Sequence, residues 1–142
     1  MNDRLNVPSR SLNLLIVEDE ALIAMMVEDA LALHGHVIVG IAEDVASALD
    51  LADAHHVDFA LCDVRLANGD SGVDAAIELG RRGIPVVYLS GNCPPSAAHR
   101  LVVGCISKPF HTASLNASVL AAFEIAGGAS PDLAPTALTL YR

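Results

Sequence analysis

The chain has 142 residues, a length that suits one domain with a buried core. Hydrophobic residues make up 53% of it and charged residues 18%, which excludes an intrinsically disordered chain. The formal net charge of −9 argues against direct binding to nucleic acid, because phosphate contacts need clustered lysine and arginine.

Two further features bear on the compartment. The sequence has no run of about 18 uncharged apolar residues that could span a bilayer, and its first residues lack the apolar core of a signal peptide. We therefore expect a cytoplasmic protein that does not contact membranes. The three cysteines, Cys62, Cys93 and Cys105, are an odd number without metal-type spacing, so we expect free thiols.

Residues 1–11 are polar and interrupted by a proline, and they predict a flexible leader. Between residues 12 and 126, apolar runs alternate with amphipathic stretches. The apolar runs predict five strands, at 12–17, 37–42, 57–62, 85–89 and 101–106. The amphipathic stretches predict five helices, at 20–33, 43–54, 73–82, 95–101 and 112–126.

The fourth of these helices must be short. Only seventeen residues separate Ser90 from Lys108, and Pro94-Pro95 restricts where a helix can begin, so about two turns fit. After the last helix, Gly127-Gly128 breaks the pattern and predicts a flexible tail over 127–142.

Strands that alternate with helices through short connections predict an α/β fold of the flavodoxin-like, doubly wound type. We expect a five-stranded parallel sheet with strand order 2-1-3-4-5 and a single domain over 12–126. In such a sheet, ligands bind outside the carboxyl ends of the strands, where the strand order reverses. Here that switch point lies between the first and third strands.

Polar residues follow four of the predicted strands. Glu18 and Asp19 follow the first strand, Asp63 the third, Ser90 the fourth, and Lys108, the only lysine, the fifth. Because parallel strands end at the same edge, we expect these five side chains to meet on one rim of the sheet.

Three carboxylates on one rim would repel one another, and a divalent cation with oxygen ligands is the natural remedy. Mg²⁺ is the best candidate, since it is commonly held by one or two carboxylates plus phosphate. Phosphoryl transfer also needs a nucleophile in line and positive charge around the phosphoryl oxygens. Asp63 can supply the nucleophile, Lys108 and the metal the charge, and Ser90 a hydroxyl donor.

With these residues in place, residues 12–126 resemble the receiver domains of two-component response regulators. The resemblance rests on Glu18-Asp19 after the first strand, on Asp63, on Ser90 and on Lys108-Pro109. It implies that Asp63 is the phosphoacceptor, that Ser90 is the family's hydroxyl residue, and that the Lys108–Pro109 peptide bond is cis. It also implies a metal site in which Asp19 and Asp63 bind directly, Glu18 binds mainly through water, and the main-chain carbonyl of Arg65 contributes.

The sequence departs from the family pattern in two places: the segment after Ser90 is short, and the residue at the aromatic switch position differs. Many receivers have an aromatic residue three places before the lysine, whereas Cys105 stands here. Residues 85–92 are partly similar to the Pro-Phe-x-Phe-Ala-Thr-Gly-Tyr signature of an alphaproteobacterial receiver subgroup, often written FATGUY.

The resemblance implies a receiver that is phosphorylated on Asp63 by a histidine kinase or a phosphotransfer protein. It implies output through contact with a separate protein, no enzymatic activity, and a homodimer as an open alternative. Two rival functions remain. One is an aspartyl-phosphate-forming hydrolase of the haloacid dehalogenase type, although that family needs a second aspartate where Arg65 stands. The other is a phosphate sink without output.

Overall fold

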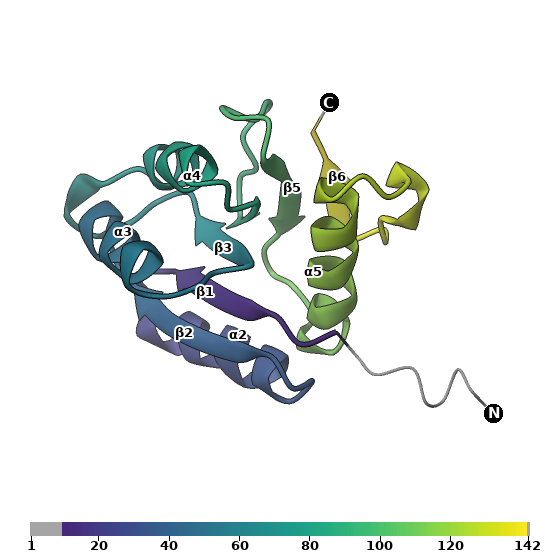
Figure 1. Cartoon of the computed structure of the whole chain (residues 1–142), viewed down its shortest axis with the longest axis horizontal. Coiled ribbons are helices and arrows are strands. Elements are labelled where there is room, and N and C mark those ends of the chain that lie inside the picture. Colours follow the sequence, from purple (N-terminus) through teal and green to yellow (C-terminus); the bar gives the residue numbers. More distant parts are fainter. Residues whose placement is uncertain (1–9, 142) are drawn as a thin grey trace.

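The computed structural model describes residues 10–141, and Figure 1 shows that they form one sheet flanked by helices. The sheet has six strands in the order β2-β1-β3-β4-β5-β6. The strands are β1 (Asn13–Val17), β2 (Val37–Ala42), β3 (Phe59–Asp63), β4 (Val86–Ser90), β5 (Val102–Ser107) and β6 (Leu138–Leu140). The α-helices are α2 (Ala21–Ala32), α3 (Val45–Ala54), α4 (Gly72–Arg81) and α5 (Thr112–Ala126).

The first five strands run parallel, and two apolar layers cover the two faces of the sheet. One layer packs α2 and α5 against residues such as Leu14, Ile16 and Leu61. The other packs α3 and α4 against Leu15, Ala60 and neighbouring side chains. Strands β1, β3 and β4 read as continuous apolar runs because both of their faces are covered. The fold class and the order 2-1-3-4-5 of the parallel strands are therefore confirmed.

Helix α2 carries apolar residues on more than one face, and only one of these faces is buried. Ala24, Val27 and Leu31 are buried against the sheet. The alternative apolar set points to solvent, with exposed fractions of 71% for Leu22, 54% for Met25, 44% for Met26 and 84% for Leu33. The helix is apolar on most of its surface, so periodicity alone could not select the buried stripe.

The sheet has a sixth strand where the sequence predicted only a flexible tail. Residues Leu138–Leu140 pair antiparallel with β5 after a short 3₁₀ turn at Pro131–Leu133. This pairing covers an edge of β5 that would otherwise present unpaired backbone groups. Alternation in Leu138-Thr139-Leu140 is only three residues long, which is too short a signal to predict a strand from sequence.

The connection between β4 and β5 also differs from the prediction. Within the described range, residues 91–101 contain no helix, so the expected short fourth helix is wrong. The consecutive prolines at 94 and 95 disfavour a helix, and a disulfide between Cys93 and Cys105 holds this segment against β5. The prediction of free thiols is therefore wrong for these two cysteines and holds for Cys62, which is free and buried.

The predicted leader, residues 1–11, lies outside the described residues except for Arg10 and Ser11. Arg10 forms an ion pair of 3.0 Å with Glu124 and lies over the ring of Phe123. In the part of the chain that the structure describes, no helix has the length and apolar character needed to cross a membrane.

Candidate functional site

The ends of β1 and β3 bring the acidic residues together. Val17 pairs with Cys62 across these parallel strands, so the residues that follow, Glu18 and Asp63, lie side by side. On the next pair of strands, Ser90 is in register with Ser107, which places Lys108 beside Ser90. An open pocket of about 500 Å³ lies at this rim, and Asp19, Asp63, Ser90 and Lys108 are among its lining residues. The predicted convergence is thus present in the structure.

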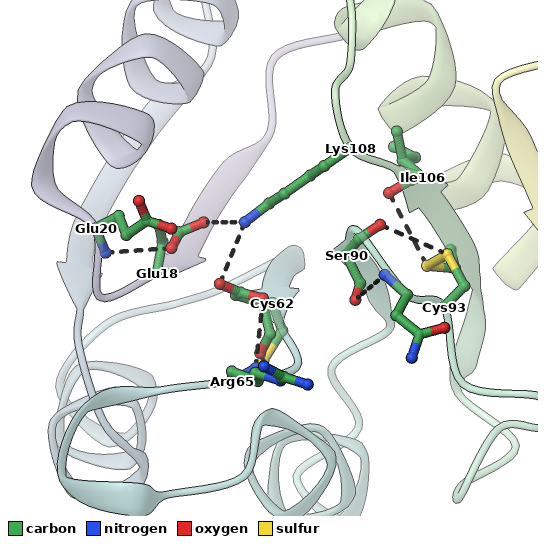
Figure 2. A network of polar contacts seen from close by, with 11 residues as sticks. Glu18, Glu20, Cys62, Arg65, Ser90, Cys93, Ile106 and Lys108 are labelled. Atoms are coloured by element: carbon green, nitrogen blue, oxygen red, sulfur yellow. Dashed lines mark hydrogen bonds and ion pairs between the residues drawn. A yellow bond between two sulfur atoms is a disulfide. The ribbon is translucent and has the colours of Figure 1, made fainter.

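Lys108 joins the two buried carboxylates. Its Nζ donates to Glu18 Oε1 at 3.0 Å and to Asp63 Oδ2 at 3.2 Å. Figure 2 shows the Lys108 side chain reaching toward Glu18. Glu18 is 2% exposed and Asp63 8% exposed, so both contacts are shielded from water. The backbone N–H of Lys108 donates to the Ser90 carbonyl at 2.9 Å, and the Lys108–Pro109 peptide bond is cis, as predicted.

Burial and the neighbouring charges shift the pKa values of Glu18 and Lys108. Burial raises the pKa of Glu18 to about 7; Asp63 adds to the rise, and Lys108 opposes it. For Lys108, burial lowers the pKa, but the ion pairs with Glu18 and Asp63 outweigh it, and the net pKa is raised. The ammonium group is therefore firmly charged, while Glu18 is easily protonated without a further cation.

The acidic residues fit a divalent cation. Glu18, Asp19 and Asp63 can each direct one carboxylate oxygen so that the three atoms lie within 4.8 Å of one another. Asp19 is exposed and opens the cluster to the pocket. Arg65 lines the same pocket. Its backbone N–H donates to Asp63 Oδ1, with 3.4 Å between the nitrogen and the oxygen. Hard carboxylate oxygens around a solvent-connected space are a donor set suited to Mg²⁺.

The buried hydroxyl of Ser90 lies on the opposite side of the pocket from the acidic pair. Ser90 Oγ accepts the backbone N–H of Asn92 at 3.1 Å. Ser90 is 6% exposed. Its hydroxyl hydrogen remains a donor that can face an anion in the pocket.

Gly72 supports Asp63, a role that sequence reasoning missed. A Cβ at Gly72 would lie 1.7 Å from the main-chain oxygen of Asp63, so only glycine fits. The Gly72 N–H donates to the Val64 carbonyl at 2.7 Å. This contact packs the first turn of α4 against the end of β3. The only signal in the sequence is a glycine directly after Ser71, which caps α4.

Asp70 is a second supporting residue that the sequence did not reveal. Its Oδ2 accepts the backbone N–H of Val45 at 3.0 Å, and its main-chain oxygen accepts the N–H of Leu66 at 3.1 Å. The loop after Asp63 is thereby tied to the start of α3.

Comparison with known proteins agrees with this arrangement. The family model described as "Response regulator receiver domain" matches residues 14–120. The transcriptional regulatory protein PdtaR of Mycobacterium tuberculosis is 42% identical over 85 residues, which are 59% of this chain and 40% of that protein. The phyllosphere-induced regulator PhyR of Methylorubrum extorquens is 33% identical over 116 residues, 75% of this chain and 41% of the relative. The chain thus spans about two fifths of the length of these regulators.

Solved structures give the same result. SdrG from Sphingomonas melonis is 34% identical with a TM-score of 0.68, and the match covers 82% of this chain and 98% of SdrG. The receiver domain of PhyR from Erythrobacter litoralis is 29% identical with a TM-score of 0.67, and the match covers 81% of this chain and 91% of that domain. A family model that spans most of the chain, together with the rim of Glu18, Asp63 and Lys108, shows that this protein belongs to the response regulator receiver domain family.

Proposed function

We propose that this receiver accepts a phosphoryl group on Asp63, with Mg²⁺ held by Glu18, Asp19, Asp63 and the main-chain carbonyl of Arg65. The donor is a histidine kinase or a histidine phosphotransfer protein, and the output is contact with a separate protein in the cytoplasm. The relatives PdtaR and PhyR are named as regulators, which agrees with a signalling role rather than an enzymatic one.

One observation carries the proposal: the single lysine of the chain lies between two buried carboxylates at the mouth of an open pocket. Lys108 is 3.2 Å from Asp63 Oδ2, so it neutralises the acceptor before transfer and can pair with the added phosphoryl oxygens afterwards.

The transfer itself needs little from the protein beyond position and charge. A carboxylate oxygen of Asp63 forms the new bond to phosphorus, while the bond from phosphorus to the histidine nitrogen of the donor breaks and the imidazole leaves with that electron pair. Ser90 can donate its hydroxyl hydrogen to a phosphoryl oxygen, and Lys108 balances a second one. Bound Mg²⁺ supplies additional positive charge for the same oxygens.

The exposed face of α2 supports a protein as the donor. Ile23, Met26, Pro109 and Phe110 line an apolar groove of about 380 Å³, and Lys108 lines both this groove and the rim pocket. A phosphohistidine carrier that covers the groove would therefore bring its histidine near Asp63. The exposed Leu22, Met25 and Met26 extend this apolar surface along the helix.

The rival hydrolase function lacks an observation in its favour. At the position where a haloacid dehalogenase needs its second aspartate, the structure has Arg65, whose backbone N–H faces Asp63. A receiver that acts only as a phosphate sink would have the same rim.

Acetyl phosphate with Mg²⁺, followed by intact-mass measurement, tests the proposal. We expect a gain of one phosphate in the wild type, and no gain when EDTA is present from the start or in Asp63→Asn. The matched control is Asp50→Asn, because Asp50 is an exposed carboxylate on α3 away from the rim, and this variant should be labelled like the wild type. Equal labelling of Asp63→Asn and Asp50→Asn would refute the assignment of the acceptor.

A further inference from the structure

The disulfide between Cys93 and Cys105 joins the segment after β4 to the adjacent strand β5, as Figure 2 shows. Cys105 is fully buried, whereas Cys93 is only half-buried. The bond spans 12 positions in the sequence and closes a loop that contains the rest of the β4–β5 connection. It therefore limits how far this connection can move from the sheet.

Residues 91–98 have few other restraints. In the described range 10–141, none of their N–H or carbonyl groups takes part in a backbone–backbone hydrogen bond. The Pro94 carbonyl accepts the Tyr141 hydroxyl at 2.7 Å, and Asn92 donates to Ser90 Oγ at 3.1 Å. A segment with so few hydrogen bonds has low local stability, and the covalent bond at Cys93 is its strongest restraint.

Cys93 also lies beside the two strand ends that form the rim. Its Sγ is 3.9 Å from the Ser90 carbonyl oxygen and 3.8 Å from Ser107 Oγ. The same Ser90 carbonyl accepts the backbone N–H of Lys108. A disulfide sulfur carries no hydrogen, while a thiol is a weak donor. Reduction would thus release residues 91–98 and add a donor next to the group that holds the backbone of Lys108.

We propose that Cys93–Cys105 is a reversible redox modification site, and that its redox state sets how tightly the rim binds a phosphoryl group. This inference rests on the proposed phosphoryl-accepting function. In the oxidised form, residues 91–98 are already fixed next to Ser90, so binding of a phosphoryl group does not require this segment to become ordered. In the reduced form, ordering this segment opposes binding, and the response is weaker.

The reductant is a dithiol and the oxidant a disulfide, which exchange by the ordinary thiolate chemistry. A thiolate of the dithiol attacks Cys93 Sγ, because Cys105 is buried; the bond between the cysteines breaks, and the Cys105 sulfur leaves with the electron pair and takes up a proton. The second thiol of the dithiol then attacks the mixed disulfide and releases Cys93, which is protonated in turn. Two electrons and two protons pass to the protein, and the dithiol becomes a disulfide.

Cys62 does not compete in this exchange. It is fully buried within the layer under α3 and α4, and burial raises the pKa of its thiol. It provides an internal control, because it should stay unreactive in the folded protein in both redox states.

The test uses the full chain, oxidised or treated with dithiothreitol, with maleimide labelling and intact mass to count thiols. We expect dithiothreitol to open the bond in the folded protein and to speed hydrogen exchange across 91–98. Beryllium trifluoride with Mg²⁺, as a mimic of the phosphoryl group, should slow that exchange in the reduced form alone. It should also bind the oxidised form about fivefold or more tightly. Cys93→Ser should behave like reduced wild type under both conditions, while Cys62→Ser should keep the full redox response.

The failures of the two proposals are distinguishable. A bond that excess dithiothreitol leaves closed in the folded protein, or equal exchange and equal affinity in both redox states, would overturn the redox site while leaving Asp63 as the acceptor. Failure of beryllium trifluoride to bind either form would refute the phosphoryl-accepting function and, with it, the regulation proposed here.

Discussion

Replacement of Gly72 by alanine tests whether the first turn of α4 holds the acceptor in position. An added Cβ would lie 1.7 Å from the main-chain oxygen of Asp63, whereas real Cβ contacts are hardly ever closer than 3.0 Å. The two backbones must therefore separate by about 1.3 Å, and the hydrogen bond from Gly72 N–H to the Val64 carbonyl, now 2.7 Å, would be lost.

Two effects of this substitution have opposite signs. Alanine is favoured over glycine in a helix by about 1 kcal/mol at most. Overpacking a rigid site costs about 1–3 kcal/mol, and the lost hydrogen bond about 1 kcal/mol more. The destabilisation from the clash is larger than the gain in helix propensity, because the closest atoms belong to the backbone and cannot rotate away. We expect a net destabilisation of about 2 kcal/mol, which lowers the melting temperature by roughly 5–10 °C.

Urea and thermal unfolding measure the loss of stability, and acetyl-phosphate labelling of the folded fraction measures the displacement of Asp63. The matched control is Gly127→Ala, because an added Cβ there meets its nearest atom at an ordinary 3.5 Å and lies far from the rim. We expect the control to remain within about 0.5 kcal/mol of the wild type. If Gly72→Ala unfolded like Gly127→Ala and was labelled at the wild-type rate, the supporting role of Gly72 would be wrong.

Two further predictions concern Glu18 and α2. Because the folded protein raises the pKa of Glu18 from 4.5 to about 7, its protonated form stabilises the metal-free fold below pH 4.5, and this contribution is lost as the pH rises through 7. The loss is on the order of 3 kcal/mol, so urea unfolding in EDTA at pH 5 and pH 8 should show a weaker pH dependence for Glu18→Gln, and an unchanged dependence would contradict the assignment. For the apolar groove, Met26→Asp should reduce phosphoryl transfer from a histidine phosphotransfer protein by about tenfold or more, a typical effect of losing an interface anchor. Its labelling by acetyl phosphate should match that of the wild type, and equal losses with both donors would place the docking surface elsewhere.

The sequence by itself determined the rim. Glu18, Asp63, Ser90 and Lys108 each follow an apolar run, and parallel strands bring their carboxyl ends to one edge whatever the details of packing. The α/β class and the order of the parallel strands came from the same local signals, because strand and helix periods are written in short stretches of the chain.

Tertiary structure decided the features that depend on contacts between distant residues. The buried face of α2 was ambiguous because the helix is apolar nearly all round, and only the packing against the sheet selected Ala24 and Leu31 over Leu22 and Met25. The pairing of Cys93 with Cys105 arose because the β4–β5 connection forms no helix and runs back along β5. The sixth strand formed because β5 offered an unpaired edge to the segment at Leu138. Sequence patterns record which groups a segment must bury or pair, but the choice among equivalent partners is made only by the three-dimensional arrangement.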